Sequence, residues 1–349
     1  MLIFILLPLL VSSPIHEGKG HHSQSHSHTY QSSSIEIDGK NNLSKPYTTG
    51  SGKYLYEVDS QRVKLPKGVS IGTTHGGVSV SDSGRIYIST NANKGIVVFD
   101  AEGNYIGDFG KEFKGTHSLI INQEKGVEYL YAAQLFGERI VKVDLEGKIV
   151  QEINHSEKNP IPGTLKGITA VAVGEDGRIY ATTGYGSNHL HIFSPAGVLL
   201  KSLGSKGKGK GQTNTNHGVA IDKRYNPHRL IVADRENRRL VHHSLEGDFL
   251  SIYEENLRRP CSFSFFGNIF AVAELQGRVV LLDQSGNVLT HLGDNPNRKQ
   301  WAGFKVPIAA ITPGAFSAPH GLAFNKKGDL IVQDWNVRGR ISKLTFLKN

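Results

Sequence analysis

Cysteine is almost absent from this chain of 349 residues, which contains a single one, Cys261. No disulfide can form within the chain, so the fold must depend on a hydrophobic core, which a domain of about 300 residues is large enough to build. Long apolar runs are equally scarce. The only one, residues 2–13, is too short to cross a membrane as a helix.

The apolar start of the chain has the length of a secretory signal peptide, and we assign residues 1–13 to one. A buried strand or a membrane anchor is the alternative, because the usual basic start is missing. Export predicts a secreted, periplasmic or extracellular protein with no stable membrane span after signal removal. Residues 14–50 are polar and rich in histidine and serine, which predicts a disordered linker that serves as a plain tether or scavenges metal.

Acidic residues are outnumbered by basic ones, and the formal net charge is +9. Much of this excess lies in one stretch, where Lys206, Lys208 and Lys210 alternate with glycine. No aromatic side chains are interleaved with these lysines, so the pattern indicates a solvated loop rather than a nucleic-acid interface. We therefore expect no nucleic acid among the partners.

An internal repeat of roughly 40–50 residues begins near residue 70. One unit reads ITAVAVG, EDGR, IYATT, GYGSN, HLHIFS, PAG and VLLKSLG over residues 168–204. Asp-Gly between alternating apolar runs indicates a hairpin, and four such strands per repeat indicate a β-propeller blade. Six units predict an all-β, six-bladed propeller over residues 53–349, expected as a monomer, in which YLYEVD (54–59) supplies the last outer strand.

Histidine recurs at one position of this repeat, in THGGVSV, THSLIIN, NHGVAID and PHGLAFN. The residues at that position in the six units are His75, His117, Thr169, His217, Cys261 and His320. Because the first strand of each blade lines the central channel, these side chains are expected to converge near the axis at one face.

Three of these histidines, His117, His217 and His320, belong to alternate blades and should lie about 120° apart around the axis. Three imidazoles in that arrangement predict a zinc site with an open position for water or substrate. His75 and Cys261 are additional or alternative ligands. The competing interpretations are that the histidines only fill the channel mouth, and that Cys261 is a small buried filler.

Loops that join second and third strands lie on the same face as this ring. They carry Tyr185 and Arg235, and at similar positions Phe136 and Trp335. A metal ion, a phenol and a guanidinium together suit a small-molecule or peptide substrate that carries a carboxylate.

The repeats resemble NHL repeats. The ordered segments Gly-Tyr, FSPAG, NHGVAID and ADREN, within residues 169–251, resemble those of the peptidyl-α-hydroxyglycine α-amidating lyases. This resemblance implies zinc held by His117, His217 and His320, and cleavage of a carbinolamide to an amide and glyoxylate. It also implies that Tyr185 is the catalytic base and that Arg235 steadies the substrate or the phenolate.

The chain differs from that family at Gly321, where the family has an aspartate that helps to bind structural calcium. The imidazole-rich ring itself suits zinc over calcium. Two other function classes stay open. One is a non-catalytic secreted propeller that binds a peptide, glycan or protein. The other is a calcium-dependent, lactonase-like hydrolase, which would need carboxylate and amide ligands in place of imidazoles.

Overall fold

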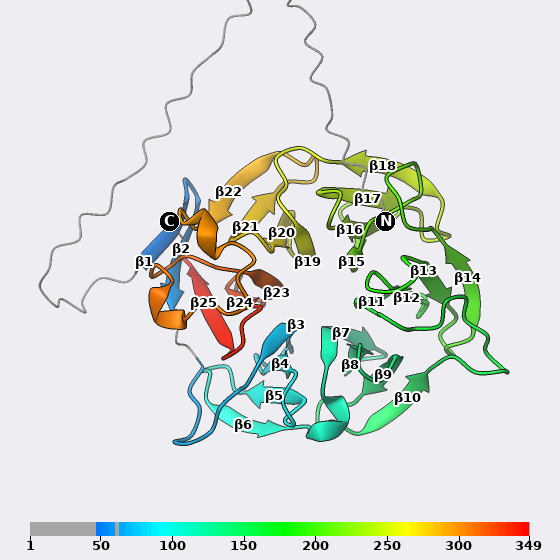
Figure 1. The fold of residues 1–349 in the computed structure, drawn as a ribbon, viewed down its shortest axis with the longest axis horizontal. Helices are drawn as coiled ribbons and strands as arrows, with labels where there is room; N and C mark the ends of the chain where they lie inside the picture. The colour runs from blue at the N-terminus through cyan, green and yellow to red at the C-terminus, as the bar shows by residue number, and fades with distance from the viewer. Residues whose placement is uncertain (1–46, 60–62, 349) are drawn as a thin grey trace, which may run out of the picture. The chain divides into compact units, whose positions relative to one another are not determined.

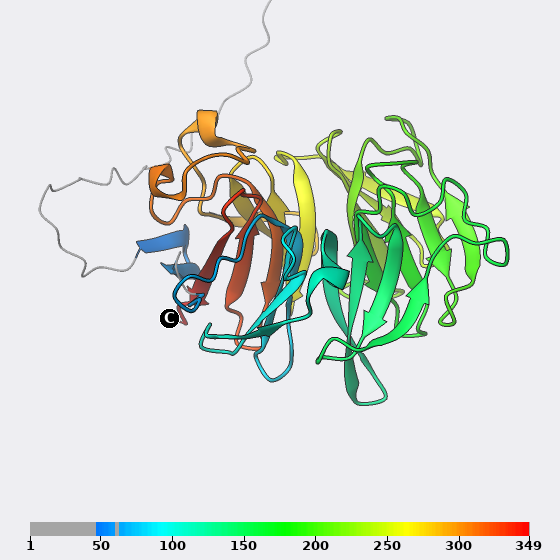
Figure 2. The ribbon, with the colours of Figure 1, turned by 60° about the horizontal axis from the view of Figure 1, so that its bottom comes forward.

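The computed structural model describes residues 47–59 and 63–348. The predicted signal peptide, residues 1–13, and the linker up to residue 46 lie outside the described residues. Within them the fold is all-β: six sheets stand around a central axis, as predicted, and three short 3₁₀ turns are the only helical elements (Figures 1 and 2). None of the described helices is long and apolar enough to cross a membrane.

The first three blades each contain four antiparallel strands, numbered from the innermost strand outward. Blade one consists of β3 (Thr74–Val80), β4 (Ile86–Thr90), β5 (Ile96–Phe99) and β6 (Tyr105–Asp108). Blade two consists of β7 (Thr116–Glu124), β8 (Val127–Gln134), β9 (Arg139–Val143) and β10 (Ile149–Ile153). Blade three consists of β11 (Ala170–Val173), β12 (Ile179–Thr182), β13 (Leu190–Phe193) and β14 (Leu199–Leu203). The turn residue Gly177 has φ 79°, the left-handed conformation that its Asp-Gly hairpin requires.

Blades four and five repeat this topology. Blade four consists of β15 (Asn216–Asp222), β16 (Arg229–Asp234), β17 (Arg239–His243) and β18 (Phe249–Tyr253). Blade five consists of β19 (Pro260–Phe266), β20 (Ile269–Glu274), β21 (Arg278–Leu282) and β22 (Val288–Leu292). The 3₁₀ turns are η1 (Lys111–Phe113), η2 (Arg298–Gln300) and η3 (Ile308–Ala310); the last two lie in the long connection between blades five and six.

Blade six closes the ring with strands from both ends of the described chain. β23 (Pro319–Phe324), β24 (Leu330–Asp334) and β25 (Arg340–Phe346) pair in order, and β2 (Tyr54–Asp59) pairs with β25, as predicted. A fifth strand, β1 (Tyr47–Ser51), pairs with β2, so the strand structure begins inside the segment that we expected to be linker up to residue 50. Its polar sequence gave no sign of this, because an edge strand is recognised by its pairing and not by burial.

Hydrophobic clusters fill the junctions between adjacent blades. In β20, Ala271 and Ala273 pack toward blade six, whereas Phe270 and Val272 pack toward blade four. This alternation follows from the two-residue period of a strand, and it makes each blade apolar on both faces. The same pattern recurs at the other junctions. Together these clusters, one at each junction, hold the first strands, and therefore the residues at the axis, in place.

Candidate functional site

In five of the six blades, the residue at the repeat position lies where the innermost strand has a β-bulge or similar irregularity. The pairing of first and second strands changes register around that position in blades one, two, four, five and six. In blade two, for example, the shift lies between Thr116 and Ser118, which leaves His117 between the two paired residues. A bulge re-aims a side chain away from the regular alternation of the strand. It explains how these five blades can each direct one side chain toward the axis.

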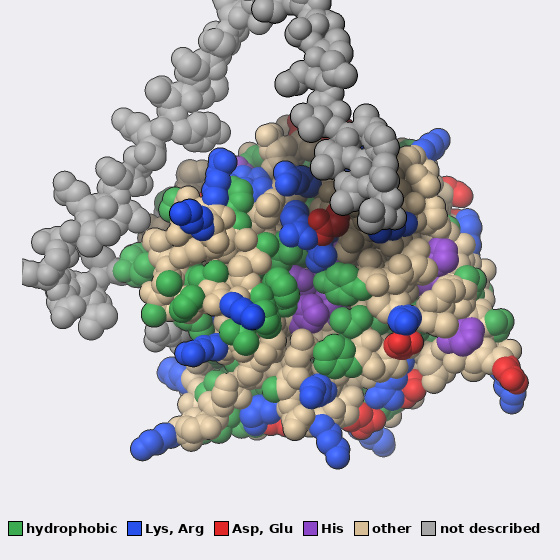
Figure 3. All heavy atoms as spheres, in the orientation of Figure 1, with side chains coloured by type: hydrophobic (Ala, Val, Ile, Leu, Met, Phe, Trp, Pro, Cys, Tyr) green, Lys and Arg blue, Asp and Glu red, His purple; other side chains and the backbone are tan. Residues whose placement is uncertain are grey.

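Four histidine side chains meet at the axis, and they form what we call the histidine ring: His75, His117, His217 and His320. Ring centroids lie 4.7 Å apart for His117 and His217, 4.5 Å for His217 and His320, and 5.1 Å for His117 and His320. His75 contacts the ring of His117 at 4.3 Å. Figure 3 shows histidine side chains at the centre of this face of the propeller.

Backbone carbonyls of the next blade orient two of these imidazoles. Nδ1 of His117 lies 2.6 Å from the Thr169 carbonyl oxygen, and Nδ1 of His217 lies 2.9 Å from that of Cys261. A carbonyl can only accept, so Nδ1 carries the proton in both residues, and both Nε2 atoms present lone pairs. Fixing the imidazole tautomer in this way is the usual support for a histidine that binds a metal.

Burial keeps the histidine ring neutral. It lowers the pKa of His75 to about 4 and lowers the pKa values of His117, His217 and His320 well below the usual range. The positive charge of Arg235 adds to this lowering in all four cases. Neutral imidazole is the form that binds metal ions, so the ring is in its ligating state at physiological pH.

Two sets of three side chains hold their ligand atoms within 4.8 Å of one another. The first contains His75, His117 and His320, and the second contains His217, Cys261 and His320. The predicted triad is thus divided between two sets that share His320. Burial raises the pKa of the Cys261 thiol to about 11, so it is protonated before any metal arrives.

Lone pairs outnumber protons at the centre of the ring. The Tyr185 hydroxyl lies 3.2 Å from Nε2 of His117 and 3.0 Å from Nε2 of His217, but it has one proton to donate. Nδ1 of His320 is buried, and it has no hydrogen-bond partner among the described residues. A cation would satisfy these surplus acceptors, and imidazole donors suit zinc. The residues present therefore fit the predicted metal.

Tyr185 and Arg235 lie together against the ring, on the face where topology predicted them. Nη1 of Arg235 donates to the Tyr185 hydroxyl at 3.1 Å, and the guanidinium lies over the tyrosine ring at 5.3 Å. The Tyr185 ring is 40% exposed, but its hydroxyl points to the histidines. Burial of that hydroxyl raises the pKa of Tyr185, and Arg235 opposes the rise.

The two predicted aromatic residues differ in position. Trp335 lies beside the ring, with its centroid 6.5 Å from that of His75, and Phe304 packs on it at 4.6 Å. Phe136 is 58% exposed, and no ring contact joins it to the histidines among the described residues. Phe304 was not expected, because it comes from the long connection after blade five, which lies outside the repeat.

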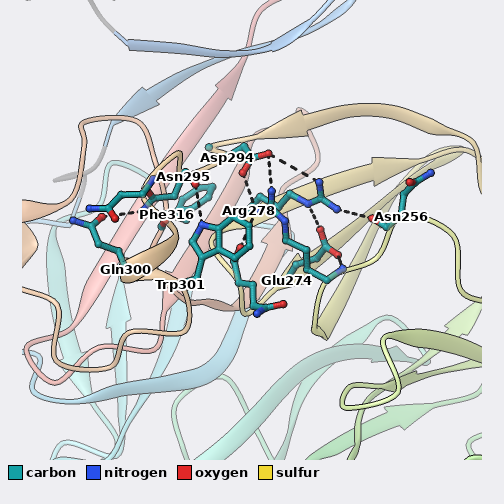
Figure 4. Close-up of polar contacts among 12 residues, drawn as sticks. Asn256, Glu274, Arg278, Asp294, Asn295, Gln300, Trp301 and Phe316 are labelled. Atoms are coloured by element: carbon teal, nitrogen blue, oxygen red, sulfur yellow. Dashed lines mark hydrogen bonds and ion pairs between the residues drawn. The ribbon is translucent and has the colours of Figure 1, made fainter. Parts of the chain in front are cut away.

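A polar cluster fastens this connection to blade five (Figure 4). Arg258 donates to Asp294 at 2.8 and 3.1 Å and covers the Trp301 ring at 3.9 Å. The Trp301 indole N–H donates to the Asn295 carbonyl at 2.8 Å, and the Asn295 amide donates to the Phe316 carbonyl at 2.8 Å. The connection is therefore held in place, and with it the Phe304 side of the site.

A cavity of about 570 Å³ extends from the ring along the first strands. It is lined by His117, His217 and His320 at one end, and by residues as far as Phe265 and Phe324 at the other. Tyr185 and Arg235 do not line this cavity. The histidine ring consequently separates the channel from the face that carries the tyrosine and the arginine.

No family model matches the sequence. Solved structures of similar fold include a streptogramin B lyase, with 14% identity and a TM-score of 0.57 over 84% of this chain and 98% of that one. The virginiamycin B lyase from Staphylococcus aureus has 14% identity and a TM-score of 0.55 over 84% and 100%. A gluconolactonase from Xanthomonas campestris has 12% identity and a TM-score of 0.61 over 87% and 95%. These likenesses support the propeller fold, and the finer resemblance to the amidating lyases stays a prediction.

Proposed function

We propose that this protein is an exported, zinc-dependent lyase that cleaves an α-hydroxyglycine-type carbinolamide to an amide and glyoxylate. The observation that carries the proposal is the Tyr185 hydroxyl, which lies at 3.2, 3.0 and 3.1 Å from His117 Nε2, His217 Nε2 and Arg235 Nη1. A proton-accepting group is thus held beside potential metal ligands by a cation that favours its ionised form. That combination suits removal of a hydroxyl proton.

The chain's own residues account for the proton transfers. Zinc held by the histidine ring would supply Lewis-acid polarisation of the substrate hydroxyl. Tyr185, ionised with the help of Arg235, accepts the hydroxyl proton. The electron pair of that O–H bond forms the carbonyl of glyoxylate while the carbon–nitrogen bond breaks. The departing amide nitrogen then takes a proton from Tyr185, which restores the enzyme.

The ligand chemistry also bears on the alternatives. Neither ligand set contains a carboxylate, whereas a calcium-dependent lactonase-like hydrolase needs oxygen ligands. A propeller that only binds a peptide, glycan or protein would not need a tyrosine between two imidazoles. Lyases and a gluconolactonase among the structural neighbours agree with a catalytic role for this fold.

The test is release of glyoxylate from α-hydroxyhippurate, the benzoyl amide of α-hydroxyglycine, by zinc-loaded protein. We expect glyoxylate and benzamide in equal amounts. Turnover should be lost when a chelator removes the zinc, and it should recover when zinc is restored. Zinc-loaded protein that releases no glyoxylate would exclude the lyase and favour the binding-only alternative.

A further inference from the structure

A single carboxylate lies between two arginines beside the histidine ring. Oε1 of Glu236 accepts from Nε of Arg235 at 2.9 Å and also from Nη2 of Arg259. Arg235 comes from the loop after β16, and Arg259 immediately precedes β19, so the contact joins blades four and five. One carboxylate oxygen thus serves two guanidiniums from different blades.

The two guanidiniums differ in how many of their N–H donors have a hydrogen-bond partner. Arg235 divides its donors between the Tyr185 hydroxyl and Glu236. Nε of Arg259 is buried, and it has no hydrogen-bond partner among the described residues. A guanidinium binds a carboxylate best through two parallel N–H donors. Arg259 donates to Glu236 through Nη2 alone, so a carboxylate that accepts from both Nε and Nη2 would bind it more favourably than Glu236 does.

The surrounding charge favours a negative ligand. Two arginines and one glutamate leave one net positive charge beside a ring that burial keeps neutral. The nearby Asp294 is already paired with Arg258 at 2.8 Å. Figure 3 shows basic side chains gathered beside the histidines at the centre of this face. An anion that reaches the ring therefore meets two guanidiniums that share a single carboxylate and carry one net positive charge.

We propose that Arg259 is the carboxylate-binding residue of the site: its Nε and Nη2 take the carboxylate of a small N-acylated amino acid, and Glu236 holds that guanidinium when no ligand is bound. Cys261 follows Arg259 by two residues and occupies the ring position of its blade, so a carboxylate bound at Arg259 lies at the edge of the ring. The choice of an N-acylated glycine as ligand rests on the proposed function, whereas the anion subsite does not.

The test measures binding without turnover. Hippurate, which lacks the reactive hydroxyl, and hippuramide, its uncharged counterpart, are titrated calorimetrically into zinc-loaded protein. Arg259→Gln should weaken hippurate binding at least about tenfold and leave hippuramide binding unchanged, because it removes charge-assisted hydrogen bonds. Arg259→Lys should restore little, since an ammonium cannot form the paired contact.

Arg238→Gln is the matched control, because Arg238 is exposed on the same loop as Arg235 and the substitution removes the same charge. It should change hippurate affinity by less than about twofold, as expected for a screened surface charge. Equal effects of Arg238→Gln and Arg259→Gln, equal weakening of hippurate and hippuramide, or no hippurate binding by the wild type would each overturn the subsite. Hippurate binding that depends on Arg259 without glyoxylate release would support the subsite and reject the lyase.

Discussion

Two sets of buried polar side chains recur in the blades, and they are satisfied in opposite ways. The outer set pairs the end of a second strand with the start of the third: Asp234 accepts from Arg239 at 2.6 Å, and Gln134 accepts from Arg139 at 2.5 Å. Glu274 and Arg278 form the same pair in blade five (Figure 4). The inner set is the histidine ring, in which Nε2 of His117 and Nε2 of His217 both face the hydroxyl of Tyr185.

In the outer set, the buried charged groups have hydrogen-bond partners. Asp234 also accepts from the Asn214 backbone N–H at 2.6 Å and from the Asn237 amide at 2.8 Å, so its buried charge is fully hydrogen-bonded. In the ring, lone pairs exceed donors, and the charge that acts on the histidines is the cation Arg235. Both sets are buried and repeated, and so burial and repetition alone do not identify a site. The surplus of unmatched acceptors does.

The largest expected effect is loss of metal from the ring. We expect about one zinc per chain in the wild type, and His320→Ala should reduce it to less than about a tenth, since His320 belongs to both ligand sets and its loss leaves each of them incomplete. Elemental analysis measures this, and His189→Ala, outside the ring, is the control. A wild-type protein purified with zinc supplied that still holds less than about a tenth of an equivalent would contradict the metal assignment.

Next in size is the effect of removing the phenol oxygen. Tyr185→Phe should lower turnover of α-hydroxyhippurate by about 10²–10⁴-fold, the usual contribution of general base catalysis. Zinc content should not change, because the histidines keep their bonds to the backbone carbonyls. Full activity of Tyr185→Phe would show that another group accepts the proton.

Substitutions in the outer set should lower the stability of the fold instead of its metal content or turnover. Asp234→Ala leaves Arg239 buried without its carboxylate, which typically costs about 3–5 kcal/mol of unfolding free energy. Chemical denaturation measures the loss, and Asp248→Ala, an exposed position on the same blade, is the control. If His217→Ala in the metal-free protein destabilised the fold as much as Asp234→Ala, the ring would be structural and the contrast between the two sets would disappear.

A smaller effect concerns pH and the buried histidines outside the ring. Burial lowers the pKa values of His191, His242 and His291 to about 4 each. The unfolded chain therefore binds protons below about pH 6.5 that the folded chain does not bind until about pH 4. Stability should fall as pH decreases through this window, by up to about 1.4 kcal/mol per pH unit for each histidine. His242→Gln should reduce the slope of unfolding free energy against pH by the equivalent of one proton, as measured by denaturation at several pH values. An unchanged slope would show that His242 does not contribute to this pH dependence.

The smallest effect is expected at the lysine loop. Lys206, Lys208 and Lys210 are exposed, as the alternation with glycine predicted. Replacing all three by glutamine should change unfolding free energy by less than about 0.5 kcal/mol per site and leave turnover unaffected. A marked loss of turnover would show that the loop takes part in substrate capture.

The repeat made much of the architecture predictable. Hairpin signals and the recurring histidine position located the six blades, and the chain path around a propeller placed Tyr185 and Arg235 on the same face as the ring. These inferences needed only the repeat of strand and turn patterns, which can be detected in a single sequence. The closing strand β2 was predicted for the same reason, since blade six otherwise lacked an outer strand.

Other features depend on contacts that no periodicity encodes. The β-bulges that turn His117 and His320 inward are visible only in the strand register. Glu236 stood in the predicted segment ADREN, but its partner Arg259 belongs to another blade, so nothing in the local pattern joined them. Phe304 lies in a connection without repeat character, and its position against Trp335 follows from tertiary packing alone.

The closure of blade six also determines when, during folding, all residues of the site can come together. Its last sheet joins β2 to β25, strands separated by most of the described chain, so the ring cannot close until both are available. His320 belongs to that blade and is shared by both ligand sets. In a chain that is still being synthesised, blades two to four are made before this residue. The proposed zinc site would therefore be complete only after blade six has folded, which would keep a partly folded chain from taking up an ion at the wrong histidines.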